Sequence, residues 1–262
     1  LQRLKMTHPK SQLLADKLLA ELLIVDEKLD EAVLLLESLH RENPSDTGIL
    51  RLLVDAYFLL EDWVMAQKLL ADIKHYAALN KRAIKLLELD IYTSLLAEFV
   101  ADPEFTEQEQ QGQLAELWEM LPQPLRKVPE VIVQYADALA AVNGTDKLQP
   151  LLTKALNNEW HPDLIDRFGG LQTSKPEKQL SIGEKWLPAH SDDAGLLLAL
   201  GRICGRLGLT GKAKDYLTSA VSLEPSPQNY LELAELLGAM GENKASATVY
   251  RDGLRAGLKE SE

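Results

Sequence analysis

Arg202 and Arg206 are the pair of side chains whose spacing most directly suggests binding chemistry. They lie four residues apart in a stretch with helical periodicity, so both guanidinium groups are expected on one helix face. Two guanidinium groups one turn apart suit a shared carboxylate ligand, such as an acidic segment of a partner protein. Because exposed charges contribute little to folding, reversing both should weaken binding and leave stability nearly unchanged.

Catalytic and metal-binding residue types do not combine into a recognisable site. The single cysteine, Cys204, falls at a core-facing helix position without a neighbouring histidine, so it is predicted to be buried. No glycine-rich phosphate loop, nucleophile elbow or His-Glu-x-x-His motif is present. The histidines do not share metal-ligand spacing; they are His8, His40, His75, His161 and His190. The sequence predicts a protein without enzymatic activity and without a metal.

The composition excludes nucleic acid as a partner. The chain has 28 Lys plus Arg and 40 Asp plus Glu, a net charge of −12, and such a surface repels phosphate backbones. A hydrophobic content of 46% and a charged content of 26% over 262 residues are typical of globular proteins. No apolar run is long enough to cross a membrane.

The elements that would position the arginines are helices. Apolar residues recur at helical spacing, as in Leu197, Leu200, Cys204 and Leu207. Alternating strand patterns are absent. The sequence therefore predicts an all-α protein.

Paired helices recur with a period of 33 or 34 residues. Ala32 and Ala66 are 34 residues apart, and Gly208 and Gly241 are 33 apart. Small residues occupy the eighth and twentieth positions of each repeat, where helix A approaches helix B, and larger residues fill the space between them. This spacing is the tetratricopeptide (TPR) pattern. The eighth positions hold Ala20, Ala136, Gly201 and Ala234, and the twentieth positions hold Ala32, Ala66, Ala213 and Ser246.

The repeats predict a right-handed TPR superhelix of about seven helical hairpins, irregular in the middle. We expect residues 1–262 to form a single solenoid domain. Trp160 to Ser174 is predicted to be a degraded hairpin. The expected parts are N-terminal repeats at 11–78, a long helix from Arg82 to Val100 and an irregular insert within 79–128, degenerate repeats at 129–190 and C-terminal repeats at 194–257.

A TPR superhelix binds partners in a concave groove lined by helix A positions two, five, nine, twelve and thirteen. The N-terminal repeats present a mixed polar and aromatic surface there, which suits a peptide segment. Some TPR domains clamp chaperone tails with Lys and Asn at positions five and nine of the first repeats. These positions hold Lys17 with Glu21 and Arg51 with Asp55 here, so that ligand is not expected. The predicted groove residues are Lys17, Glu21, Arg51, Asp55, Phe58, Asp137, Arg202 and Arg206.

Two stretches carry a more specific resemblance. They combine Leu50-Arg51-Leu52 with Ala56-Tyr57 and Trp63, and Tyr230-x-x-Leu233-Ala234-x-x-Leu237 with Arg251-Asp252-Gly253-Leu254. Together they resemble the bacterial HemY-type protohaem IX biogenesis proteins, in which two membrane helices precede a TPR domain. The resemblance implies a non-catalytic scaffold of late haem synthesis that binds haem-pathway enzymes through its groove. It also implies an anchor upstream of Leu1 that holds the domain at the bacterial inner membrane, on the cytoplasmic face.

Two alternatives stay open. The chain is either a direct carrier of haem or porphyrin, with His75, Tyr76 or His161 as the iron ligand and the paired arginines on the propionates, or a general TPR adaptor of the bacterial envelope. A scaffold needs no cofactor, whereas the carrier would bind haem. A protoporphyrinogen oxidase is not expected, because the dinucleotide fingerprint is missing.

Overpacking the contact between paired helices tests the repeat pattern. Ala213 takes the twentieth position of its repeat, so Ala213→Trp should lower the free energy of unfolding by about 1–3 kcal/mol. Chemical denaturation measures this change. An unchanged free energy of unfolding would contradict the assignment of repeats.

Overall fold

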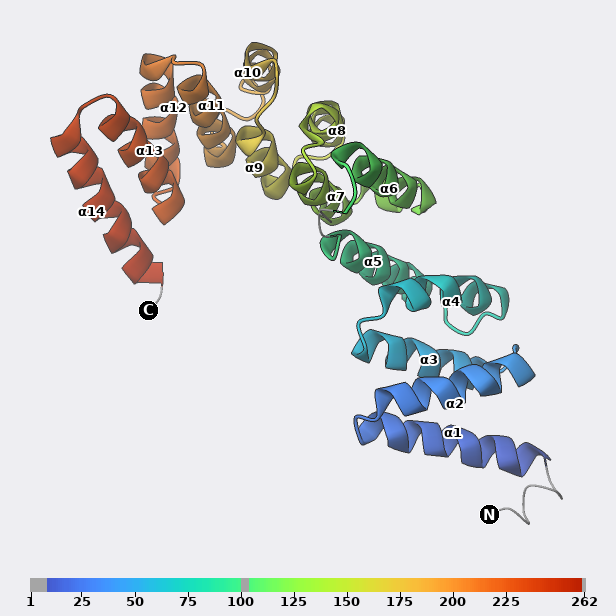
Figure 1. Cartoon of the computed structure of the whole chain (residues 1–262). Helices are drawn as coiled ribbons and strands as arrows, with labels where there is room; N and C mark the ends of the chain where they lie inside the picture. The colour runs from blue at the N-terminus through green and yellow to red at the C-terminus, as the bar shows by residue number, and fades with distance from the viewer. Residues whose placement is uncertain (1–8, 100–103, 261–262) are drawn as a thin grey trace. The chain divides into compact units, whose positions relative to one another are not determined.

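The computed structural model describes residues 9–99 and 104–260. Over these residues the protein consists of fourteen α-helices and one short 3-10 helix, without a β-strand (Figure 1). The chain forms two compact units that divide after Phe99, and each is described by itself. The all-α, TPR-like fold is therefore confirmed, while a single solenoid across residues 1–262 stays a prediction.

The first unit is built from five helices. α1 packs against α2 and α3 against α4, and α2 and α4 also contact the helix that follows each of them. The side chains of Asp46, Asp62 and Asn80 accept backbone N–H bonds at the starts of α3, α4 and α5, and so fix where these helices begin. The helices are α1 Pro9–Val25, α2 Leu29–Glu42, α3 Thr47–Leu59, α4 Trp63–His75 and α5 Lys81–Ala97.

The second unit contains the remaining helices. α7, α9, α11 and α13 are the A helices of its hairpins, and each contacts the next A helix. α8 packs against α7 and α9, α10 against α11, α12 against α11 and α13, and α14 against α13. The helices are α6 Glu107–Met120, η1 Leu125–Lys127, α7 Pro129–Ala141, α8 Thr145–Asn158, α9 Pro162–Gly170, α10 Pro176–Glu184, α11 Ala194–Arg206, α12 Thr210–Leu223, α13 Pro227–Ala239 and α14 Asn243–Glu260.

The small residues lie where the TPR pattern predicts. At Gly201 a Cβ atom would lie only 2.5 Å from Cδ2 of Leu217, so α11 and α12 approach more closely than a larger residue allows. Cys204 is buried, as predicted. The alanines at these positions are buried as well: Ala20, Ala32, Ala66 and Ala213.

The insert is more regular than the sequence analysis predicted. The expected long helix is α5, but the polar run after it contains a complete second helix, α6. A capping box starts α6: the Thr106 hydroxyl accepts the N–H of Glu109, and the Glu109 carboxylate accepts the N–H of Thr106. The Thr-x-x-Glu signal is present in the sequence, but the polar composition of the run concealed the helix.

The segment predicted to be a degraded hairpin keeps the register of the repeats. Pro162 begins α9 and stands 33 residues after Pro129, which begins α7. Gly169 takes the eighth position, and a Cβ atom there would lie 2.6 Å from Cα of Ala199. α9 and α11 therefore meet at backbone distance, which only glycine permits.

Aromatic side chains fill this part of the second unit. Trp160 stacks on His190 with the ring centroids 3.6 Å apart, and it meets Trp186 edge-on at 5.6 Å. Trp186 also contacts Phe168 of α9. These two tryptophans are packing residues, as predicted, and Trp186 packs against α9 through Phe168.

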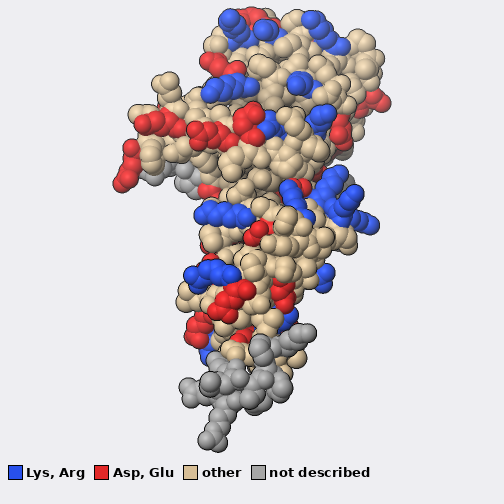
Figure 2. Space-filling model, turned by 90° about the vertical axis from the view of Figure 1, so that its right-hand side faces the viewer, with Lys and Arg blue, Asp and Glu red and all other residues tan. Residues whose placement is uncertain are grey.

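Charges of both signs are distributed over the surface. On the face shown in Figure 2, basic and acidic side chains are interspersed, so the acidic excess is not gathered in one patch there. Among the described residues, no helix combines the length and the apolar character needed to span a bilayer.

Replacing Gly169 tests the backbone contact between α9 and α11. The added methyl group of Gly169→Ala would overlap the backbone of Ala199, which cannot move without shifting α11. We expect the free energy of unfolding to fall by about 1–3 kcal/mol, measured by chemical denaturation.

The matched control is Gly205→Ala in α11, where a Cβ atom would meet no atom within 4 Å. Alanine favours helix more than glycine does, so this change should be neutral or stabilise by up to about 1 kcal/mol. Equal effects of the two substitutions would contradict the close contact at Gly169.

Candidate functional site

The A helices of the second unit line an open groove with a volume of about 1010 Å³. It runs past α7, α9, α11 and α13, with α8 contributing to one wall. Two of the predicted groove residues, Asp137 and Arg202, lie in this wall. The structure therefore brings together side chains from hairpins that are far apart in sequence.

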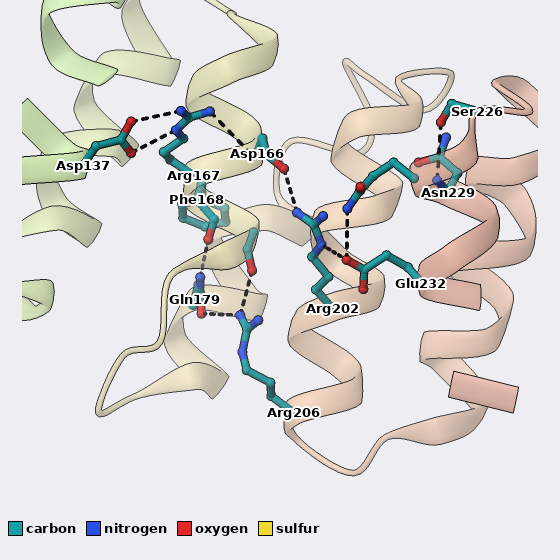
Figure 3. A network of polar contacts seen from close by, with 12 residues as sticks. Asp137, Asp166, Arg167, Phe168, Gln179, Arg202, Arg206, Ser226, Asn229 and Glu232 are labelled. Carbon is teal, nitrogen blue, oxygen red and sulfur yellow. Dashed lines mark hydrogen bonds and ion pairs between the residues drawn. The ribbon is translucent and has the colours of Figure 1, made fainter. Parts of the chain in front are cut away.

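Five charged side chains alternate in sign along the groove and form what we call the ion-pair ladder (Figure 3). Arg167 donates to both carboxylate oxygens of Asp137, from Nε at 3.1 Å and from Nη2 at 3.0 Å. Arg202 bridges two carboxylates, from Nη1 to Asp166 at 2.7 Å and from Nε to Glu232 at 2.8 Å. An ion pair of 3.6 Å between Arg167 and Asp166 joins the two halves.

The register of the repeats brings the ladder together. Asp137 and Arg202 take the ninth position of their repeats, whereas Arg167 and Glu232 take the sixth position of the repeats that follow. When one hairpin stacks on the next, the ninth side chain of one A helix meets the sixth side chain of the next A helix. The same stacking therefore produces both ends of the ladder.

The carboxylates of the ladder face solvent more than its central arginine does. The side chain of Arg202 is 13% exposed, against 47% for Asp137 and 52% for Asp166. Burial alone would lower the pKa of Arg202, but its bonds to Asp166 and Glu232 outweigh burial and raise that pKa, so the guanidinium group stays charged. The groove thus presents carboxylate oxygens to a ligand and holds the guanidinium group behind them.

The expectation that Arg202 and Arg206 form a free cationic pair is wrong. Arg202 already bridges two carboxylates, as described above. Nη2 of Arg206 donates to the carbonyl oxygens of Gly169 at 2.9 Å and Leu171 at 3.2 Å, at the end of α9. Burial and the neighbouring Arg202 lower the pKa of Arg206. The two guanidinium groups diverge, because Arg202 is held between Asp166 of α9 and Glu232 of α13, whereas Arg206 is held by the carbonyls at the end of α9.

Three members of the ladder were missed in the sequence: Asp166, Arg167 and Glu232. The first two lie in the segment to which no repeat register was assigned. Two residues reveal the register of that segment: Pro162 at the first position and Gly169 at the eighth. Glu232 was missed because the sixth position was not counted among the groove positions.

Three of the predicted groove residues of the first unit make contacts within the protein itself: Lys17, Arg51 and Phe58. Nζ of Lys17 pairs with Asp46 at 3.0 Å, and Nε of Arg51 donates to the carbonyl of Ala78 at 2.9 Å. Lys17 and Arg51 both take the fifth position: Lys17 reaches the residue that caps α3, and Arg51 reaches the turn after α4. Phe58 meets Trp63 edge-on with the ring centroids 4.9 Å apart. The other two, Glu21 and Asp55, stay exposed. Neighbouring protein atoms partly desolvate the Asp55 carboxyl and raise its pKa.

The candidate haem ligands occupy ordinary helix ends. His75 is exposed in the last turn of α4, edge-on to Tyr76. Nδ1 of His161 accepts the backbone N–H of Asp163 at 3.3 Å and so caps α9. Within the described ranges no three His, Cys, Asp or Glu side chains are placed to hold a metal ion. Haem binding at these residues stays a prediction.

Solved structures of MamA resemble the chain in part. The match to MamA 41-end from Desulfovibrio magneticus RS-1 has 17% identity and a TM-score of 0.43, and covers 67% of this chain and 98% of that one. A MamA RS-1 double mutant gives 16% identity and a TM-score of 0.43, over 66% of this chain and 96% of that one. No protein-family model and no curated protein matches the sequence. The fold assignment rests on the helix packing described above, and the HemY-type resemblance stays a prediction.

Reversing the charge of Arg202 tests whether the ladder supports the fold. Arg202→Glu would remove the cation from Glu232, leave Asp166 with only its longer ion pair to Arg167 and add a third carboxylate beside them. We expect the free energy of unfolding to fall by about 1.5–3 kcal/mol, the size of a lost charge-assisted hydrogen bond. Lys147→Glu, at an exposed position of α8, is the control and should change it by less than about 0.5 kcal/mol. Equally small effects would show that Arg202 is not held in the ladder.

Asp46 couples the stability of the first unit to pH. Burial alone would raise the pKa of Asp46, but bonds from Lys17 and from the N–H groups of Gly48 and Ile49 outweigh it and leave the pKa below its ordinary value of 3.8. A carboxyl group with a lowered pKa stabilises the fold above its unfolded pKa. It loses that contribution as the pH falls through the folded pKa.

Asp46→Asn keeps a capping side chain and removes the charge. We expect it to lower the free energy of unfolding by about 0.5–1 kcal/mol near neutral pH. The difference from the unsubstituted protein should shrink as the pH falls below about 4. Denaturation of both proteins across this range measures the effect, and a difference independent of pH would show that the charge of Asp46 does not contribute.

Proposed function

We propose that the protein is a non-catalytic scaffold that binds a partner protein through the groove of its second unit, and that the bound segment carries Lys or Arg. The exposure of the ladder is the observation that supports this most directly. Asp137 and Asp166 face the groove, while Arg202 lies behind them. A partner side chain therefore meets acceptor oxygens first.

The hydrogen bonds of the ladder favour a basic segment over an acidic one. Three carboxylates and two guanidinium groups leave one negative charge in excess. An incoming carboxylate would have to displace Asp166 or Glu232 from Arg202. An incoming Lys or Arg adds to the exposed oxygens of Asp137 and Asp166 without breaking a bond. The ligand charge is therefore opposite to the one that two free arginines would select.

The walls of the groove suit a peptide with apolar residues beside its basic ones. The exposed Ala140 of α7 lines the groove next to the ladder, with the buried Ala136 and Leu148 behind it. Its volume of about 1010 Å³ is at the upper end of small-molecule pockets and accommodates a short chain segment. Apolar contact with these walls adds sequence preference to the charge preference.

The narrower proposal concerns the pathway. That the partners are haem-pathway enzymes, and that the domain stands at the cytoplasmic face of a bacterial inner membrane, is supported by the resemblance of residues 50–63 and 230–254. Surface plasmon resonance with purified enzymes of late haem synthesis tests this part. Binding to them, but not to unrelated enzymes of similar charge, is the expected result. Equal binding to both sets would remove the haem pathway from the proposal.

Peptide binding tests the groove itself. Among labelled peptides of equal length that are Lys-rich, Glu-rich or neutral, fluorescence anisotropy should show binding of the Lys-rich peptide alone, weakened by salt. The double variant Asp137→Asn with Asp166→Asn should bind it about a hundredfold more weakly, since two lost charge-assisted bonds of about 1.5 kcal/mol each amount to about 3 kcal/mol.

The control removes two negative charges outside the groove, at the exposed residues Asp192 and Asp215. The variant Asp192→Asn with Asp215→Asn has the same net charge as the groove variant and should bind like the unsubstituted protein. If both double variants lose affinity equally, binding follows net charge and not the groove. Preference for the Glu-rich peptide would overturn the proposed ligand class.

A further inference from the structure

The hairpin of α13 and α14 carries an apolar cleft that the proposed function does not use. The cleft has a volume of about 540 Å³ and lies between exposed side chains of the two helices. We call it the end cleft, and its principal residues are Tyr230, Leu231, Tyr250, Leu254 and Leu258. Leu254 is 73% and Leu258 71% exposed, and with the other lining side chains they form an exposed apolar patch.

The preceding hairpin shows what such a cleft holds. Leu198, Leu217 and Val221 of α11 and α12 share a buried cluster with Leu233 and Leu237 of α13, which is the next A helix. These three residues stand 33 positions before Leu231, Tyr250 and Leu254. The end cleft is therefore the repeat-equivalent seat of an A helix, and within the described residues no helix fills it.

α1 carries the matching face. Leu19 and Leu22 take the same repeat positions as Leu233 and Leu236, the residues with which α13 packs on the hairpin before it. Leu233 is 6% exposed, whereas Leu19 is 48% exposed. The difference arises because no described hairpin precedes α1. One helix thus displays the apolar face that the end cleft is shaped to cover.

The charges beside the two faces are complementary. Among the described side chains of α13 and α14, the exposed basic residues Lys244, Arg251 and Arg255 outnumber the exposed acidic Glu235, and Asp252 pairs with two of them, Arg251 and Arg255. The exposed charged residues of α1 and the turn after it are mainly acidic, since Glu21, Asp26 and Glu27 outnumber Lys28. Opposite charges beside the two surfaces favour the binding of α1 to the end cleft. They disfavour the pairing of two α1 helices or of two end clefts.

We propose that the protein associates head to tail, with α1 of a second copy seated in the end cleft. The contact repeats between copies the packing that α13 makes on α11 and α12 within one copy. Such an interface is heterologous: each copy uses its α1 toward one neighbour and its end cleft toward the other. Association therefore continues beyond two copies, into rings or open chains, as the concentration rises.

Light scattering coupled to size exclusion tests the proposal with the 262-residue chain. The mass should rise with concentration above the 29.2 kDa of one copy. Leu22→Glu on α1 and Leu254→Glu in the end cleft place a charge on exposed positions, so both variants should fold. Each variant alone should elute as a single copy. Leu34→Glu, a control on the exposed face of α2, should associate like the unsubstituted protein.

Mixing the two variants gives the sharpest result. Leu22→Glu keeps an intact end cleft and Leu254→Glu keeps an intact α1, so the mixture should form pairs and stop there. Association of Leu22→Glu or Leu254→Glu by itself would overturn the proposal, because it would show an interface between identical faces. A mass of one copy at every concentration would overturn it as well.

Discussion

Each hairpin of this protein has a flank that only the next hairpin can cover, and the rest of the structure depends on that contact. The fifth side chain of helix A reaches forward whatever its chemistry. Lys17 pairs with the residue that caps α3, Asp166 pairs with Arg202, and Leu198 shares a buried cluster with Leu233. The hairpins therefore stack in the same way throughout, although the contact is an ion pair in some hairpins and apolar packing in others.

Small residues decide how closely the stacked helices approach. Gly169 allows α9 to meet α11 at backbone distance, and Gly201 leaves room for the Leu217 side chain of α12 against α11. That closeness also determines the polar chemistry of the groove. Charged side chains from successive A helices come within hydrogen-bond distance, and Asp137, Arg167 and Arg202 satisfy one another or their neighbours in the ladder. Packing and polar pairing are thus consequences of one geometry.

A groove whose charges are already paired binds differently from one with free cations. Its selectivity depends on which partner of each ion pair faces solvent, and in the ladder the carboxylates do. The same dependence on stacking explains the uncovered faces. Among the described helices, leucine-rich faces that no hairpin covers lie on α1 and on the pair of α13 and α14.

The sequence by itself determined the periodic features: all-α hairpins, small residues between paired helices, and the placement of Asp137 and Arg202 along the groove. Such features follow from spacing along one helix, which sets which face is apolar. Only the tertiary structure decided the partners of the charged side chains, because those partners lie on helices about one repeat away. Arg202 and Arg206 share a helix and are one turn apart, yet Arg202 turns to Asp166 and Glu232 while Arg206 turns to the carbonyls at the end of α9. The rotation of neighbouring helices about their axes is fixed only when the hairpins stack, so the sequence pattern could place the arginines but not say what they bind.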